Sequence, residues 1–243
     1  MFIRSRRDII DGSTGRRWAL DANDGVMTTT GAIQGFMGAG ADMTTVSFAA
    51  AIVLITGALS LAAGTFAELA QERGHQRRAV ERQQVLLARS PEEEFSDLEE
   101  HYSNLGLDAP LAKQVATQLT QRNALAAHLE TDLGLLDPPP PAWQPWWGGF
   151  LTVLGFISGA LPLTVTVLLV SEDVRAVASI SVVVICLTMS GVVAWASGSG
   201  TAGRAIARSL LTGLFVAVVA FSAGLLLEAI DQFVPQIDVN RNN

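Results

Sequence analysis

Charged side chains are scarce in this sequence of 243 residues. They make up 16% of it, whereas a soluble domain usually carries about 25%. The deficit is uneven, because charges crowd into residues 1–24 and 68–137 while four long stretches contain almost none. This distribution excludes an ordinary soluble domain. It predicts an all-α, polytopic membrane protein that carries one polar insertion.

Cysteine and a basic surface are also lacking. Cys186 is the single cysteine, so the chain cannot form a disulfide within itself. The formal net charge is −7, and no basic stripe with interleaved aromatic residues is present, so we expect no nucleic-acid partner. Residues 1–20 lack the apolar core of about 7–15 residues that precedes a cleavage site, so we interpret them as a retained arm.

Four stretches reach the length of about 20 mostly apolar residues that a membrane-spanning helix requires. They cover residues 45–67, 147–170, 177–197 and 206–230. A fifth stretch, residues 24–41, is weaker because it is rich in small and hydroxyl-bearing residues. We predict five transmembrane helices, with a cytoplasmic helical insertion between the second and the third.

The weak first stretch predicts a helix that is covered by protein and not by lipid. Gly31, Gly35 and Gly38 recur at three- and four-residue spacing on one helix face, which lets a neighbouring helix approach closely. Two acids stand at its entrance. We interpret Asp21 as an interfacial residue or a cap. Asp24 is a functional candidate because an acid inside a membrane is costly, with a helix cap as the alternative.

Lysine and arginine are distributed unequally across these spans. With five spans, one side of the membrane receives residues 1–23, 68–146 and 198–205 and the adjoining end of the last helix, which together hold 14 of the 16 basic residues. Arg175 and Arg241 fall on the other side. The positive-inside rule then places the N-terminus and the insertion in the cytoplasm and the C-terminus outside. Because we find no targeting peptide, we expect a bacterial inner (plasma) membrane, with a vacuolar membrane as the alternative.

These positions divide the chain into five parts. They are a cytoplasmic N-terminal arm (1–20), transmembrane helices 1 and 2 (21–67), a cytoplasmic acidic helical domain (68–142), transmembrane helices 3 to 5 (143–232) and a C-terminal tail (233–243). Within the insertion, Ser90 followed by Pro91 and two glutamates predicts the start of a helix. Asp108 is expected to cap a further helix, and Gly134 to end the last one.

Four residues of the insertion are candidate metal ligands. Glu94 and Asp97 lie at i and i+3, and we expect them on a face opposite Leu98. His128 and Asp132 form an i, i+4 pair on the last helix of the insertion. Carboxylate and imidazole together suit first-row divalent metals. A solvated acidic face is the alternative interpretation.

Several segments together resemble the vacuolar iron transporter (VIT) family, of which the chain would be a divergent member. They are "DANDGVMTTTGAIQGFMGAG" at the first span, "SLAAGTFAE" in the second, and "SPEEEFSDLEEHYSNLGLDAPLAKQVATQLT" and "LETDLGLLDPPP" in the insertion. The resemblance implies a homodimer of five-span protomers that exports Fe²⁺, and often Mn²⁺, from the cytosol in exchange for protons. It implies no tightly bound cofactor, since the metal ion is the transported substrate.

The resemblance also assigns pathway residues. Asp24 matches the family's first-span carboxylate, which would bind the ion and carry the exchanged proton. Met27 stands three residues later on the same face, where it could offer a soft contact. Gln34 is a further pathway candidate from its position alone, ten residues past Asp24 and roughly on the same face. Glu68 would replace the acid that is common in the second span, where this chain has Thr65.

Some positions depart from the family pattern. Leu61 stands where a pathway methionine is usual, and Gln83 and Leu86 stand where iron-binding members present glutamates. These departures leave open a second interpretation, a non-transporting membrane scaffold or metal-responsive module of the same fold. An enzyme is not expected, because neither H-E-x-x-H nor G-x-S-x-G is present.

Overall fold

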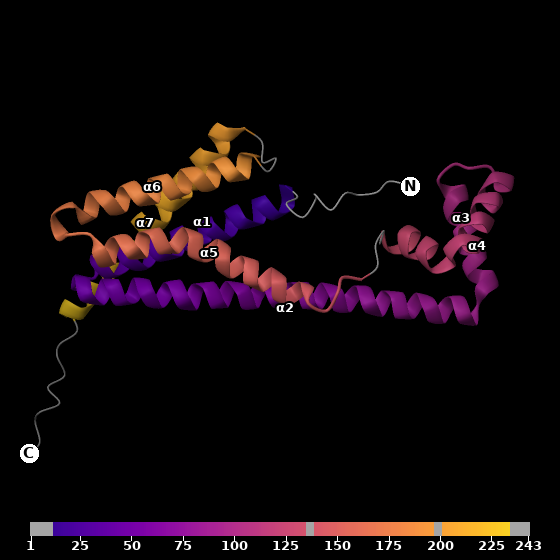
Figure 1. The fold of residues 1–243 in the computed structure, drawn as a ribbon, viewed down its shortest axis with the longest axis horizontal. Helices are drawn as coiled ribbons and strands as arrows, with labels where there is room; N and C mark the ends of the chain where they lie inside the picture. The colour runs from indigo at the N-terminus through magenta and orange to yellow at the C-terminus, as the bar shows by residue number, and fades with distance from the viewer. Residues whose placement is uncertain (1–11, 135–138, 197–200, 234–243) are drawn as a thin grey trace, which may run out of the picture. The chain divides into compact units, whose positions relative to one another are not determined.

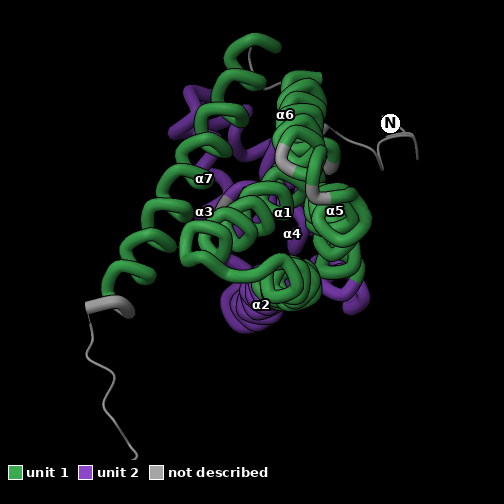
Figure 2. The backbone as a smooth tube through the Cα atoms, turned by 90° about the vertical axis from the view of Figure 1, so that its left-hand side faces the viewer, with its two compact units in different colours: residues 1–65, 147–243 green, residues 66–146 purple. Residues whose placement is uncertain are grey.

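The computed structural model describes residues 12–134, 139–196 and 201–233, which form seven α-helices and no strand. The helices are α1 (Gly12–Gly38), α2 (Met43–Arg89), α3 (Pro91–Asn104), α4 (Ala109–Leu133), α5 (Gln144–Leu169), α6 (Glu172–Ala196) and α7 (Ala202–Phe233) (Figure 1). The all-α prediction is confirmed. Two compact units divide the chain, unit 1 with residues 1–65 and 147–243 and unit 2 with residues 66–146 (Figure 2).

Four helices are long and apolar enough to cross a membrane. They are α2, α5, α6 (over Asp173–Ala196) and α7 (over Ala202–Ile230). These correspond to four of the five expected spans. Helix α1 is not among them, so its role as a fifth span stays a prediction. It begins at Gly12, so residues 12–20 of the expected arm already belong to this helix.

Helix α1 lies in the middle of unit 1. In Figure 2, α2, α5, α6 and α7 are arranged around it. Ile33 of α1 packs in one buried cluster with Val46 and Ala50 of α2 and with Leu163 and Val167 of α5. The weak first stretch is therefore covered largely by other helices, which explains how a segment of low hydropathy is accommodated here.

The glycine row of α1 faces α7, as the spacing predicts. A methyl group added to Gly31 would lie 3.4 Å from Val216, and one added to Gly35 would lie 3.6 Å from the carbonyl oxygen of Ala220. At Gly38 such a methyl would overlap the backbone of Phe221. The two helices therefore meet backbone to backbone, an approach that a larger side chain would prevent.

Unit 2 is built from the second half of α2 together with α3 and α4. Pro91 is the first residue of α3, with Ser90 as the N-cap and three glutamates in the first turn, as the sequence predicts. Helix α4 has Asp108 as its N-cap and Gly134, at φ 63°, as its C-cap. At Asn123 the backbone is extended, and the Asn123 side chain accepts a hydrogen bond from Ala126 N at 3.1 Å. This residue caps the second segment of α4.

The core of unit 2 is small. Leu98 of α3 packs against Ala116 and Ala127 of α4. The chain that returns toward α5 is held by Arg73, whose Nε donates to the carbonyl oxygen of Pro140 at 2.8 Å. Few large apolar side chains are buried in this cluster, so the polar contacts of unit 2 carry more weight in its stability.

Candidate metal sites in the two units

Asp24 lies on the uncovered side of α1. Its side chain is exposed, and so are those of Leu20 and Thr28, one turn before it and one turn after it. These three residues form a row that the described helices of unit 1 leave open. A carboxylate is costly to place against lipid. If α1 spans the membrane, this row must therefore face water or another protein surface.

The other three expected pathway residues lie in different surroundings. Met27 is half-buried, and its Sδ accepts a hydrogen bond from Asn23 Nδ2 at 3.8 Å. Gln34 lines an apolar cavity formed by α1, α5, α6 and α7. Glu68 is exposed and belongs to unit 2, whereas Asp24 belongs to unit 1. Of the three, Met27 is the one that lies within one helical turn of Asp24.

Asp21 has a partner that sequence reasoning missed. Its side chain is half-buried and forms a hydrogen bond with Thr152 of α5. The hydroxyl oxygens of Thr152 and Thr65 lie 3.2 Å apart, which extends the contact to α2. Gly155 makes room for this arrangement, since a methyl there would lie 2.7 Å from Asp21 Cβ. Three helices thus meet at a carboxylate and two hydroxyl groups, all of them oxygen ligands that a divalent cation accepts.

In unit 2, a buried polar trio joins α2, α3 and α4. Glu94 Oε2 accepts a hydrogen bond from Gln83 Nε2 and lies 3.5 Å from His128 Nδ1. Gln83, Glu94 and His128 are 7%, 8% and 2% exposed. The expectation that Glu94 lies on a face opposite Leu98 is wrong, because Leu98 is also buried, at 1%. Residues at i and i+4 share a helix face, and here this face packs on α4.

The four expected ligands of the insertion do not form one cluster in what the structure describes. Glu94 and His128 come together, whereas the Asp97 side chain is exposed on α3. The side chain of Asp132 lies outside the described residues. Across the described parts of the chain, no three His, Cys, Asp or Glu side chains are placed to hold one metal ion. The Gln83 amide lies beside Glu94 as its hydrogen-bond donor.

The sequence indicated Glu94 and His128 as candidate ligands, but it did not indicate the contact between Gln83 and Glu94. Gln83 is buried whereas its neighbours Arg82 and Gln84 are exposed, and the apolar residues around it give no clear periodicity. Its partner Glu94 is eleven residues away on another helix. The contact therefore depends on how α2 and α3 fold back at Ser90, which a helical pattern alone does not specify.

Two comparisons with known proteins cover most of the chain. A family model described as "VIT family" matches residues 16–225. A protein named "Vacuolar iron transporter" from Acanthamoeba castellanii is 27% identical over 217 residues, which cover 89% of this chain and 79% of that relative. The family match includes Asp24, the Asp21–Thr152–Thr65 contact and the trio of unit 2.

Proposed function

This chain belongs to the VIT family, and from that membership we propose that it moves divalent transition-metal ions, Fe²⁺ or Mn²⁺, out of the cytosol in exchange for protons. The family match over residues 16–225 is the observation that carries this proposal. The name of the relative from Acanthamoeba castellanii supports iron as a substrate. The four apolar helices long enough to cross a membrane agree with a multi-pass transporter.

Asp24 is the proposed ion-binding residue. Its ionised carboxylate offers hard oxygen ligands to a divalent ion. Once the ion has left, an uncompensated carboxylate in a membrane is unfavourable, and binding a proton removes its charge. One side chain would thereby alternate between metal and proton, which is the minimal requirement for exchange. The half-buried Met27 Sδ, one turn along α1, is the proposed soft contact.

The open row on α1 supports a homodimer. Leu20, Asp24 and Thr28 are exposed, whereas Ala22, Val26 and Thr29 of the same stretch of α1 are buried by other helices of the chain. A second copy packed on this row would shield Asp24 from lipid and bring two carboxylates to one interface. Two such acids offer a charge of −2, which matches the transported ion.

The test uses the purified chain in proteoliposomes. Fe²⁺ or Mn²⁺ added outside is followed by a metal-quenched dye inside, and protons are followed by a pH-sensitive dye in parallel vesicles. We expect metal uptake to exceed that of empty liposomes, to rise with an opposing proton gradient, and to move protons the other way. Metal flux equal to that of empty liposomes would refute the transport proposal. Metal flux without proton movement would refute the exchange alone.

We also propose the orientation that the basic residues predict, with the N-terminus and residues 68–142 on the cytoplasmic side of a plasma membrane. Since Cys186 is the single cysteine, a Cys186→Ala background permits single-cysteine mapping. A cysteine at the exposed Asp108 should react with a membrane-impermeant maleimide only after the cells are opened. Reaction in intact cells would contradict this orientation.

The scaffold interpretation has one observation in its favour. The buried trio of unit 2 is closed by a hydrogen bond between Gln83 and Glu94 and lacks a third charged or imidazole ligand among the described residues. Such a module would dock a partner through unit 2 instead of delivering metal. Absence of metal flux together with recovery of one stoichiometric partner from cells would favour it over transport.

A further inference from the structure

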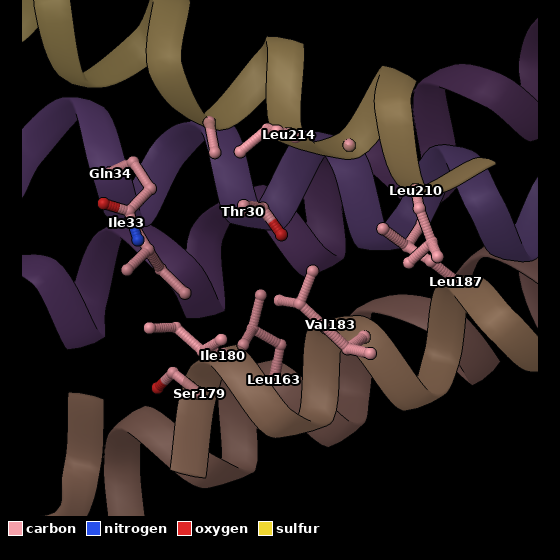
Figure 3. Close-up of a pocket in the computed structure, with 13 residues that line it drawn as sticks. Thr30, Ile33, Gln34, Leu163, Ser179, Ile180, Val183, Leu187, Leu210 and Leu214 are labelled. Atoms are coloured by element: carbon pink, nitrogen blue, oxygen red, sulfur yellow. The ribbon is translucent and has the colours of Figure 1, made fainter. Parts of the chain in front are cut away.

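We propose that unit 1 contains a binding site for a small neutral alcohol, formed by a cavity between α1, α5, α6 and α7. The cavity has a volume of about 180 Å³. Its walls are mainly aliphatic, with Ile33 of α1, Leu163 of α5, Val183 and Leu187 of α6 and Leu214 of α7 among the lining residues (Figure 3). An apolar cavity of about 150 Å³ is large enough to bind benzene, so a ligand with a hydrocarbon part of that size fits here.

Thr30 places a hydroxyl group in the wall of this apolar cavity. Its side chain is 5% exposed, and its hydroxyl finds no hydrogen-bond partner among the described residues. Threonine in a helix commonly bonds to the carbonyl oxygen one turn back, as Thr164 does to Ala160 at 3.0 Å. Figure 3 shows the Thr30 hydroxyl directed into the space between α1 and α6 instead. A buried hydroxyl without a partner costs about 1–3 kcal/mol, and a ligand hydroxyl would remove this cost.

The charge and the position of the cavity restrict its ligand. Among the described residues, no Asp, Glu, Lys, Arg or His lines it, and the polar lining residues are Thr30, Gln34 and Ser179. A metal ion, a phosphate or a carboxylate would therefore be bound without a countercharge, which is unfavourable in an apolar surrounding. The exposed side chains of Ile180 and Leu214 lie at its rim, on helices long enough to span a membrane. Ligands would enter from the bilayer, where neutral amphiphiles dissolve.

The position of Thr30 separates this site from Asp24, the proposed ion-binding residue. Asp24 lies on the open row of α1, whereas Thr30 lies on a side of the same helix that other helices cover. Gln34 lines the apolar cavity and not the open row. The alcohol site therefore does not depend on whether the protein transports metal.

The experiment uses the full chain in nanodiscs with a hexanol derivative that carries an alkyl diazirine. Ultraviolet light attaches the bound probe covalently, and mass spectrometry of peptides locates it. We expect saturable labelling of the α6 and α7 segments that line the cavity, and we expect unlabelled hexanol to compete. Labelling spread over all lipid-facing helices, or labelling that hexanol does not reduce, would overturn the proposal.

Matched variants test the volume and the hydroxyl separately. Ala217→Phe fills the cavity and should abolish saturable labelling, whereas Val218→Phe places the same ring on the exposed neighbour of α7 and should leave it intact. Thr30→Val should weaken hexanol binding about two- to tenfold, the effect of one hydrogen bond. Thr29→Val is the control, because Thr29 is equally buried and without a partner in the described residues but does not line the cavity.

A hydrocarbon analogue of the probe, without its hydroxyl, distinguishes an alcohol from a lipid tail. The alcohol proposal expects this analogue to label the wild type more weakly and to be unaffected by Thr30→Val. Equal labelling by both probes in the wild type, with no effect of Thr30→Val on either, would contradict it and identify a lipid acyl chain as the occupant.

Discussion

Replacing Gln83 with glutamate tests whether the buried trio of unit 2 is one ligand short of a metal site. Gln83→Glu removes the amide N–H that donates to Glu94 Oε2 and places a second carboxylate beside it. Both positions are less than one tenth exposed. With His128 at 3.5 Å, the variant would present two carboxylates and one imidazole. We expect it to lose stability without metal and to gain metal affinity.

The loss of folding stability is set by whichever is smaller, the cost of keeping both carboxylates charged or the cost of protonating one of them. Two carboxylates about 4 Å apart repel each other by about 4 kcal/mol at an effective dielectric constant of 20, and the lost hydrogen bond adds about 1.5–3 kcal/mol. Binding a proton to one of the two carboxylates sets an upper limit to this destabilisation. Protonating a glutamate with an ordinary pKa of about 4.3 costs about 3.7 kcal/mol at pH 7, and the protonated group can donate to Glu94 in place of the amide. The loss should therefore be about 4 kcal/mol at pH 7.

The sign of the pH dependence follows from the same reasoning. The folded variant holds an extra proton that the unfolded chain releases near pH 4.3, so the loss should shrink by about 1.4 kcal/mol for each unit that the pH falls. At pH 7, hydrogen exchange of the α3 and α4 amides should be about a thousandfold faster than in the wild type. Mn²⁺ at about 100 times its dissociation constant should restore about 2.7 kcal/mol.

The matched control is Gln84→Glu, which adds the same charge at the exposed next residue of α2. It should leave both exchange and Mn²⁺ binding unchanged. The reasoning is refuted if Gln83→Glu exchanges at the wild-type rate at pH 7 after correction for intrinsic rates. It is equally refuted if Mn²⁺ fails to protect α3 and α4 in that variant.

Three further substitutions test other contacts. Gly159→Ala would place a methyl group against the backbone of α1. This clash should cost more than the helix-propensity gain of about 1 kcal/mol, so the unfolding temperature should fall. At Gly64 an added methyl would meet no atom within 4 Å, so Gly64→Ala should keep or raise the unfolding temperature. Asn123→Ala removes the cap of the second segment of α4 and should lower the stability of that segment by about 1 kcal/mol. Its backbone amides should then exchange hydrogen about fivefold faster. Thr152→Val releases Asp21 and should lower metal flux about tenfold, the effect of one charge-assisted hydrogen bond; unchanged flux would exclude this contact from the pathway.

Local signals in the sequence predicted much of the fold. Helix α3 begins at Pro91 with Ser90 as its N-cap, because proline is pre-organised for the first position of a helix and its missing N–H is not needed there. Gly134 ends α4 in the left-handed conformation that glycine adopts at low cost. The row from Gly31 to Gly38 faces a neighbouring helix because small residues at that spacing leave a groove for its backbone.

The contacts between helices were not predictable in the same way. Asp21 was interpreted as an interfacial residue or a cap, and its hydrogen-bond partner Thr152 comes from α5, more than 100 residues later in the chain. Thr65 and Thr152 are separated by 87 residues. Glu94 was placed on the wrong face because its acidic neighbours suggested solvent, whereas burial follows from the amide and the imidazole that α2 and α4 supply. Helix α1 is not among the four helices that are long and apolar enough to cross a membrane, so the fifth span stays a prediction.

Metal flux through Asp24→Asn proteoliposomes tests the central proposal most directly. The substitution keeps the size of the side chain and removes its charge, so an ion ligand that also carries a proton loses both roles. Asp42→Asn is the control, because this acid lies in the turn before α2, where Thr44 N donates to it at 3.2 Å. We predict that Asp24→Asn abolishes Fe²⁺ and Mn²⁺ flux and the coupled proton movement, while Asp42→Asn retains both. Wild-type flux in the Asp24→Asn vesicles would contradict the proposal.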